Sequence, residues 1–353
     1  FELLNYISLQ ISPEEFQNLI NAYRNKYPFQ ELSFDSLRVE MVNRYNIPLD
    51  DFIPRWYKAH DIPSYIVKDL KVQKIESDEN ELYLLAFNIY NNSEIDGIIS
   101  TSTATNPKRH VYDIPAGTSW NIREMHETDI PVLNIDLNLS RNIPSGITIQ
   151  SREITEVIPP PAVGKFSIGN QSFLPAPDEI IVDNEDSGFQ INTSSRKKKL
   201  STLLSPGREK QYVFKQALMD MNQIPHAEWT FCAGTEGFYG DIIKSVVYKK
   251  AGKGNNPVTW TGELPRDGRY EVFIYVVDNQ SPYEGYSEQY YTLSTKEGEE
   301  EITLKIGTME YGWISVGAFD FSAGKNTITL SDRSTNPDQI IYADAVKWKY
   351  ISQ

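Results

Sequence analysis

The sequence predicts a mainly β protein of 353 residues, in which a helical segment precedes two antiparallel β-sandwiches. Three observations lead to this fold class. In residues 291–348, short β-branched and aromatic runs alternate with polar residues, and Gly, Asn, Asp or Ser separates the runs. Residues 62–152 show the same period-two alternation. Residues 1–60 instead carry helix-capping signals and apolar residues at helical spacing.

Three helices are expected near the start of the chain. Ser12 and Glu15 form the pattern of a capping box, which predicts a first helix from the next residue onward. A second helix is expected over 36–45. A third is expected over 49–57, where Pro54 fits only in the first turn or at a kink.

The first sandwich is expected over 61–157, with turns at Asn91-Asn92 and Asp96-Gly97. The triple proline at 159–161 favours a stiff, extended linker over 158–177. The second sandwich is then expected over 178–353. The predicted strands of the first sandwich are 65–67, 70–75, 82–90, 98–103, 121–123, 132–137 and 146–149.

Composition excludes several classes of function. The net charge of −14 disfavours a general nucleic-acid partner, because a polyanion would be repelled. The single cysteine, Cys232, excludes an intrachain disulfide and a cysteine-based zinc site, and we expect it to be a small buried hydrophobic residue. No apolar run is long enough to span a membrane.

Residues of about 178–350 resemble the golvesin/xanthan-lyase carbohydrate-binding-like domain. The matching segments are 181–189, 260–272, 313–321, 323–324 and 343–348. The resemblance implies a jelly-roll β-sandwich that accompanies bacterial extracellular enzymes. The chain departs from the family pattern by an insertion over 195–228, with a basic run at Arg196–Lys199 and an expected helix near 208–222.

Residues of about 10–150 resemble the C-terminal part of gluzincin metallopeptidases of the aminopeptidase N type. The similar segments are 52–57, 61–65 and 114–118, although Asp61 stands where that family often has Gly. The resemblance implies that the chain follows a metallopeptidase-like domain. Because the chain begins at Phe1 within an amphipathic stretch, we expect it to be a segment of a longer protein.

Catalytic motifs are missing from the sequence. The four histidines are His60, His110, His126 and His226, and none belongs to an HExxH zinc motif. His126-Glu127 lacks the second histidine, so solvated loop histidines are expected rather than a zinc site. Neither a Gly-x-Ser-x-Gly elbow nor a phosphate loop is found. We therefore predict that this chain is not an enzyme.

Candidate ligand-binding residues are aromatic, because flat rings stack on the apolar faces of sugars. They are Tyr283, Tyr286, Trp229 and Tyr239. Trp313, Trp348 and Phe321 are expected in the core instead.

A structural calcium ion is a second hypothesis for the C-terminal sandwich. The resemblance suggests that it lies between the first and last strands, where oxygen ligands could converge. The candidate ligands are Asp183, Glu185, Asp186 and Asp344. The alternative is that these acids only form turns. No other cofactor is expected.

Two functional hypotheses remain. The first is a non-catalytic C-terminal region of a larger bacterial metallopeptidase-like protein, with a module that binds polysaccharide or another extracellular polymer. The second is a purely structural role, in which both sandwiches pack against an upstream catalytic or membrane-linked domain and bind no glycan. An extracytoplasmic location, periplasmic or at the cell surface, follows from the resemblance alone.

Overall fold

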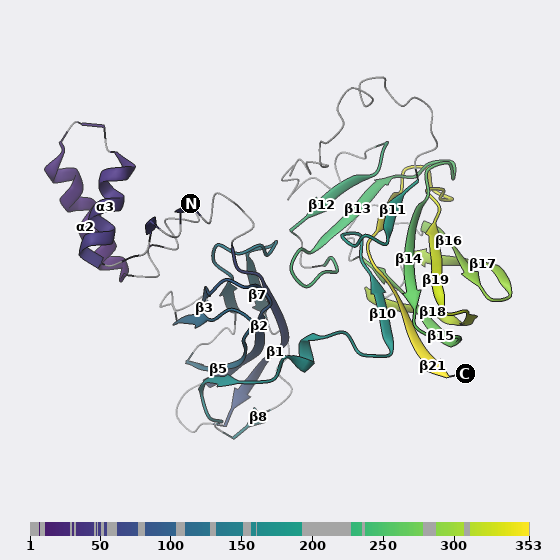
Figure 1. Cartoon of the computed structure of the whole chain (residues 1–353), viewed down its shortest axis with the longest axis horizontal. Coiled ribbons are helices and arrows are strands. Elements are labelled where there is room, and N and C mark those ends of the chain that lie inside the picture. Colours follow the sequence, from purple (N-terminus) through teal and green to yellow (C-terminus); the bar gives the residue numbers. More distant parts are fainter. Residues whose placement is uncertain are drawn as a thin grey trace. The chain divides into compact units, whose positions relative to one another are not determined.

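The computed structural model describes residues 7, 11–28, 30–31, 33–45, 47, 49–50, 53–54, 62–76, 82–103, 110–127, 132–150, 157–159, 161–192, 227–234, 237–277, 287–306 and 311–352. It divides into two compact units, residues 1–174 and 175–353. Strands dominate both units, which confirms the predicted mainly β fold (Figure 1). None of the described helices is long and apolar enough to cross a bilayer.

In the described part of the helical segment, the longer helices are α2 (Pro13–Lys26) and α3 (Phe34–Tyr45). The predicted capping box is confirmed: the Glu15 amide donates to Ser12 Oγ at 3.1 Å, and the Ser12 amide donates to Glu15 Oε2 at 3.1 Å. Residues 49–50 and 53–54 are also helical, and the rest of the predicted third helix lies outside the described residues. The buried apolar side chains of this segment are Ile7, Ile11, Leu19, Met41, Ile47 and Leu49.

The N-terminal sandwich is built from two sheets. The first has the strand order β8-β1-β2-β5-β9 and the second β4-β3-β6-β7. The strands are β1 (Tyr65–Ile75), β2 (Leu82–Asn91), β3 (Gly97–Thr103), β4 (His110–Ile114), β5 (Ser119–Glu127), β6 (Val132–Asp136), β7 (Gly146–Gln150), β8 (Val157–Ile158) and β9 (Gly164–Ser167). Residues that alternate along these strands fill the core between the sheets. Those that are buried are Tyr65, Leu85, Phe87, Ile89, Ile99, Ile114, Ile122, Ile135 and Leu137.

The segment predicted as a linker, 158–177, contains ordered structure. Strand β9 pairs with β5, and the short 3-10 helix η1 (Asn170–Phe173) buries Phe173. Only the last residues of the expected linker, from Pro175, belong to the second unit. Gly164–Ser167 adds a strand to the edge of β5, where backbone groups need partners.

The C-terminal sandwich has three sheets, with the orders β10-β21-β15-β18, β11-β14-β19-β16-β17 and β12-β13-β20. Its strands are β10 (Glu179–Val182), β11 (Phe189–Ile191), β12 (Thr230–Ala233), β13 (Ser245–Lys250), β14 (Val258–Leu264), β15 (Gly268–Val276), β16 (Ser287–Thr295), β17 (Gly298–Ile306), β18 (Gly312–Phe321), β19 (Gly324–Leu330), β20 (Ile340–Ala343) and β21 (Val346–Ser352). The predicted insertion at 195–228 lies outside the described residues apart from 227 and 228, so its helix near 208–222 stays a prediction.

Large aromatic side chains fill the core of the C-terminal sandwich. Trp260, Trp348, Tyr270 and Phe321 are each at most 1% exposed. Core positions for Trp348 and Phe321 are therefore confirmed, and Cys232 is buried as predicted. The first strand, β10, pairs antiparallel with the last, β21, which brings the two ends of the domain together.

Candidate functional sites

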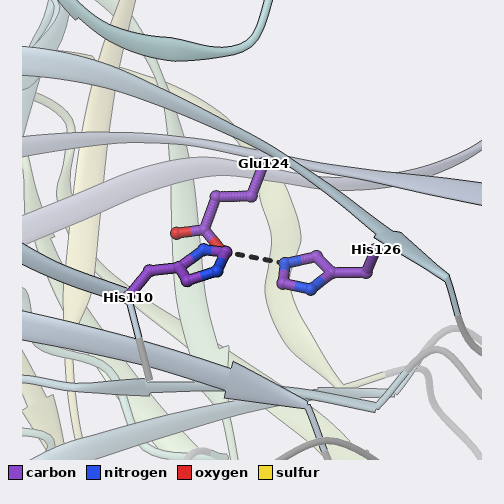
Figure 2. Close-up of side chains that lie close together, drawn as sticks. All are labelled: His110, Glu124 and His126. Atoms are coloured by element: carbon purple, nitrogen blue, oxygen red, sulfur yellow. Dashed lines mark hydrogen bonds and ion pairs between the residues drawn. The ribbon is translucent and has the colours of Figure 1, made fainter. Parts of the chain in front are cut away.

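Two polar side chains of β5 face one side chain of β4 across the N-terminal sandwich (Figure 2). Strand β4 belongs to one sheet and β5 to the other, and the turn at 115–118 joins them. On β5, Glu124 and His126 alternate with outward residues and follow buried Ile122 on the inner face. On β4, His110 lies on the same face as Tyr112 and Ile114. We call His110, Glu124 and His126 the His–Glu–His cluster.

The Glu124 carboxylate is the centre of this cluster and is buried. Its Oε2 atom lies 2.8 Å from His126 Nε2 and 3.2 Å from His110 Nδ1. The two imidazole rings stack with centroids 5.7 Å apart and planes at 18°. Thr101 on β3 donates its hydroxyl to Glu124 Oε1 at 2.5 Å. Among the described residues, these three form the group of three or more His, Cys, Asp or Glu side chains whose donor atoms all lie within 4.8 Å of one another.

The surroundings of Glu124 favour its ionised, negatively charged form. Burial raises the pKa of Glu124, but hydrogen bonds from His126, Thr101 and Tyr112 and the nearby His126 charge outweigh it, so the pKa is below its ordinary value. Burial, the Glu124 charge and the hydrogen bond to Glu124 raise the pKa of Tyr112. An anionic carboxylate therefore faces two imidazoles, which is an arrangement able to hold a proton or a metal ion.

The structure corrects the prediction for these histidines. His110 and His126 were expected in solvated loops, yet both lie on strands and meet at one carboxylate. The available signal was the spacing Glu124-x-His126 on a strand, which places both side chains on one face. The position of His110 could not be predicted in the same way, because it depends on how the sheet that contains β4 packs against the sheet that contains β5. His60 and His226 lie outside the described residues.

A second candidate site lies on the outer face of the sheet β10-β21-β15-β18 in the C-terminal sandwich. Alternation along β15 buries Ile274 and Val276 and leaves Phe273 and Tyr275 on the other face. Tyr275 pairs in register with Trp313 of β18, and Phe273 pairs with Lys347 of β21. Half-buried aromatic rings therefore gather on a sheet face that the core does not use.

Tyr239 completes this group of rings. Its ring centroid lies 5.0 Å from that of Trp313 and 5.4 Å from that of Tyr275, and the latter two lie 5.3 Å apart. The Lys347 ammonium lies 4.8 Å from the Trp313 centroid. Beside the rings, Ser315 donates its hydroxyl to Glu271 Oε1 at 2.6 Å. We call Tyr239, Tyr275, Trp313 and Lys347 the aromatic surface.

The structure places the predicted aromatic ligands in different settings. Tyr239 belongs to the aromatic surface, whereas Trp229 packs against the core and donates its indole N–H to Asn256 O at 2.7 Å. Tyr283 and Tyr286 lie outside the described residues, so their roles stay predictions. Trp313 was expected in the core and is half-buried on the outer face instead, because the register of β18 places it opposite Tyr275 rather than opposite a core position.

Two of the predicted calcium ligands lie next to the paired ends of β10 and β21. Asp183 follows β10 and Asp344 precedes β21, and both side chains are buried. Asp344 Oδ2 accepts from the Tyr239 amide at 3.1 Å, whereas Asp344 Oδ1 is buried with no hydrogen-bond partner. Asp186 Oδ2 accepts from the Asp183 amide at 2.8 Å, and Glu185 accepts from Ser245 at 2.8 Å.

Both carboxyl groups are harder to ionise than an exposed aspartate. Burial and then the Asp344 charge raise the pKa of Asp183 to about 9. Burial raises the pKa of Asp344 well above its ordinary value. Burial and then the charges of Asp241, Asp183, Asp186 and Asp344 raise the pKa of Tyr239. The hydrogen bond from the Tyr239 amide to Asp344 places the aromatic surface beside this acidic residue.

Comparison with known proteins bears on the C-terminal sandwich. Residues 213–350 match the family model of the Golvesin C-terminal domain. This match confirms the golvesin part of the resemblance. No curated protein matches the chain. The match does not extend to residues 10–150, so the likeness to aminopeptidase N stays a prediction.

Several solved structures are similar to the chain. A xanthan lyase of Paenibacillus shares 14% identity at a TM-score of 0.35, over 82% of this chain and 26% of its own. The chain thus spans about a quarter of that enzyme's length. A structure of carbohydrate-binding modules from the β-sandwich superfamily shares 8% identity at a TM-score of 0.24, over 82% of this chain and 97% of its own. Similarity at this level carries no information on ligand or activity.

Proposed function

We propose that the C-terminal sandwich is a non-catalytic carbohydrate-binding module that holds sugar on its aromatic surface. The observation that carries the proposal is the meeting of Tyr239, Tyr275 and Trp313, with centroids 5.0–5.4 Å apart, on a sheet face outside the core. Half-buried aromatic rings of this kind offer flat apolar area together with polar edges. The match of residues 213–350 to the Golvesin C-terminal domain supports the same class of function.

The chemistry of the surface suits a neutral or acidic polysaccharide. The C–H faces of pyranose rings stack on aromatic rings, and their hydroxyls need planar or charged hydrogen-bonding groups. Lys347 and Glu271 lie on the same sheet face as the rings and supply such groups. Because Lys347 also forms an ion pair with Glu179 at 3.4 Å, its ammonium is held in position rather than extended into water.

For the protein as a whole, we propose a non-catalytic region of a larger bacterial, extracytoplasmic protein with a metallopeptidase-like domain upstream. This part rests on the sequence resemblances. The alternative is a structural role, in which the aromatic surface packs against the upstream domain and binds no glycan. The two readings differ in what the isolated chain retains: a binding module keeps its affinity for polysaccharide, and a packing surface has none.

We also propose that Asp183 and Asp344 hold a calcium ion. The unpartnered Oδ1 of buried Asp344 supports this, because a buried carboxylate oxygen needs a donor or a cation. Calcium takes six to eight oxygen ligands, which carboxylates, carbonyls and water can supply. Its role would be to neutralise two buried charges and to join the end of β10 to the start of β21.

Affinity electrophoresis against a panel of plant, host and bacterial polysaccharides, followed by calorimetry on any hit, tests the carbohydrate proposal. Trp313→Ala and Tyr275→Ala should each weaken binding by about 1–3 kcal/mol, as for truncated aromatic anchors in other interfaces. Tyr290→Ala is the matched control, because that tyrosine lies on the other sheet under Arg333. Absence of binding across the panel would favour the structural role. Equal losses in the control would show that the binding does not depend specifically on the aromatic surface.

A further inference from the structure

The His–Glu–His cluster combines three donor atoms of types that bind metal ions. Two imidazoles and one carboxylate converge from two different sheets, and Glu124 is buried beside Thr101 and Tyr112. Burying a carboxylate and two polar rings at the edge of a hydrophobic core is unfavourable unless their polar atoms are satisfied. The cluster is remote in sequence from the golvesin match, which covers residues 213–350.

We propose that the His–Glu–His cluster is a site for a divalent transition-metal ion, with Zn²⁺ the best fit. The ligands are His110 Nδ1, His126 Nε2 and Glu124 Oε2. Two imidazole nitrogens with one carboxylate oxygen form a set that zinc and its first-row neighbours bind well, whereas calcium and magnesium prefer oxygen alone.

The spacing of the donor atoms agrees with this assignment. Metal–ligand bonds of about 2.0–2.1 Å in a tetrahedral site place neighbouring ligand atoms about 3.3 Å apart. Glu124 Oε2 lies 3.2 Å from His110 Nδ1 and 2.8 Å from His126 Nε2. All three donor atoms lie within 4.8 Å of one another.

The surroundings supply an outer shell of the kind that orients metal ligands. Thr101 donates to Glu124 Oε1, which leaves Oε2 directed at the two imidazoles. Tyr112 also forms a hydrogen bond with the Glu124 carboxylate. Because the His110 side chain is 42% exposed, the ion can enter from solvent, and water can occupy the remaining coordination position.

The consequence for the fold is a cross-link between the two sheets. The ligands come from β4 in one sheet and β5 in the other, so a bound ion would tie the sheets together at this end of the sandwich. An ion that binds only the folded state stabilises it by RT ln(1 + [ion]/Kd), so the melting temperature rises with the logarithm of the ion concentration once that exceeds Kd.

Calorimetric titration of the metal-stripped full chain with ZnCl₂ tests the site. We expect one ion per chain and a rise in melting temperature. His110→Ala should weaken the affinity at least tenfold, because it removes one of three protein ligands. Glu124→Gln removes the carboxylate ligand and should also weaken zinc binding. Its control is Glu127→Gln, which makes the same charge change at an exposed position on the same strand and should bind zinc as the wild type does.

Titration with Co²⁺ gives a second readout, because a tetrahedral nitrogen–oxygen site produces visible absorption bands without the thiolate bands that Cys232 would add. His126→Ala removes a more buried ring and could disturb folding, so half-exposed His110 remains the decisive position. No stoichiometric zinc binding would overturn the proposal and leave a hydrogen-bonded network. Unchanged affinity in His110→Ala, or thiolate bands in the cobalt spectrum, would place the ion elsewhere and overturn it equally.

Discussion

Two buried carboxyl groups should make the stability of the C-terminal sandwich fall as the pH rises. Burial and the neighbouring Asp344 charge raise the pKa of Asp183 to about 9 in the folded state, and burial raises that of Asp344. In the unfolded chain both carboxyl groups have a pKa of about 3.9. Because the folded state binds these protons more tightly than the unfolded chain, protonation stabilises the folded domain. This contribution is fully present below about pH 4 and is lost as the pH rises to about 9.

The size of the effect follows from the width of this window. One carboxyl group that stays protonated when folded and ionises on unfolding changes the free energy of unfolding by about 1.4 kcal/mol per pH unit. Between about pH 5 and pH 8, Asp183 alone should therefore lower the stability by about 4 kcal/mol when no cation is bound. That amount is a large fraction of the total stability of a typical domain.

Urea denaturation of residues 175–353 in EGTA, followed by tryptophan fluorescence at several pH values, measures this slope. The double variant Asp183→Asn/Asp344→Asn keeps the shape of both side chains and should flatten it. The control pair Glu263→Gln/Asp338→Asn makes the same charge change at exposed positions and should retain it. Added Ca²⁺ should remove most of the slope in the wild type, because a cation stabilises both ionised carboxylates.

Two results would refute this reasoning. A wild-type stability that is flat or rises between about pH 5 and pH 8 in EGTA would mean that the carboxylates are ionised and already compensated. A slope that survives in the asparagine pair would assign it to other groups. If calcium changes neither the slope nor the melting temperature, the calcium proposal fails while the linkage argument stands.

Three further predictions concern packing and capping. Lys249→Met should lower the free energy of unfolding in urea by about 3–5 kcal/mol, because it leaves the buried Asp332 carboxylate without its cation. In the wild type the two side chains pair at 2.5 Å and are at most 3% exposed. If the double variant with Asp332→Leu recovers none of this loss, the explanation is wrong. Gly262→Ala should cost about 1–3 kcal/mol, because its Cβ would lie 2.8 Å from Cζ3 of buried Trp348; an unchanged urea midpoint would count against it. Ser12→Ala should destabilise the helical segment by about 1 kcal/mol while Ser12→Asp does not, measured by circular dichroism; equal loss in both would show that the cap is unimportant.

Local signals were sufficient wherever neighbours in sequence decide the structure. The capping box at Ser12 and Glu15, and the alternation of 82–90, led to the observed helix α2 and strand β2. The golvesin resemblance was also carried by short segments in a fixed order. By contrast, β9 was missed, because a four-residue strand beside a proline run has too little pattern to be distinguished from an extended linker.

The candidate sites could be predicted only in part. Tyr239 and the acidic residues were identified by type, because aromatic rings and carboxylates suggest ligands by their chemistry. Trp313 was assigned to the core because a tryptophan in an alternating run is usually buried, and its outward position depends on the pairing of β18 with β15. Likewise, nothing near His110 in sequence indicates Glu124, which is fourteen positions away on the opposite sheet.

The sequence by itself determined the mainly β class, the helices near the start of the chain and the similarity of residues 213–350 to the Golvesin C-terminal domain. It could do so because periodicity, capping and motif order are properties of neighbouring residues. Only the tertiary structure decided which groups meet: His110 with Glu124 and His126, Tyr275 with Trp313, and Asp344 with the Tyr239 amide. The physical reason is that a strand's period states which residues share a face, whereas the choice of partner strand and register, set by burial of the whole core, decides what that face contacts.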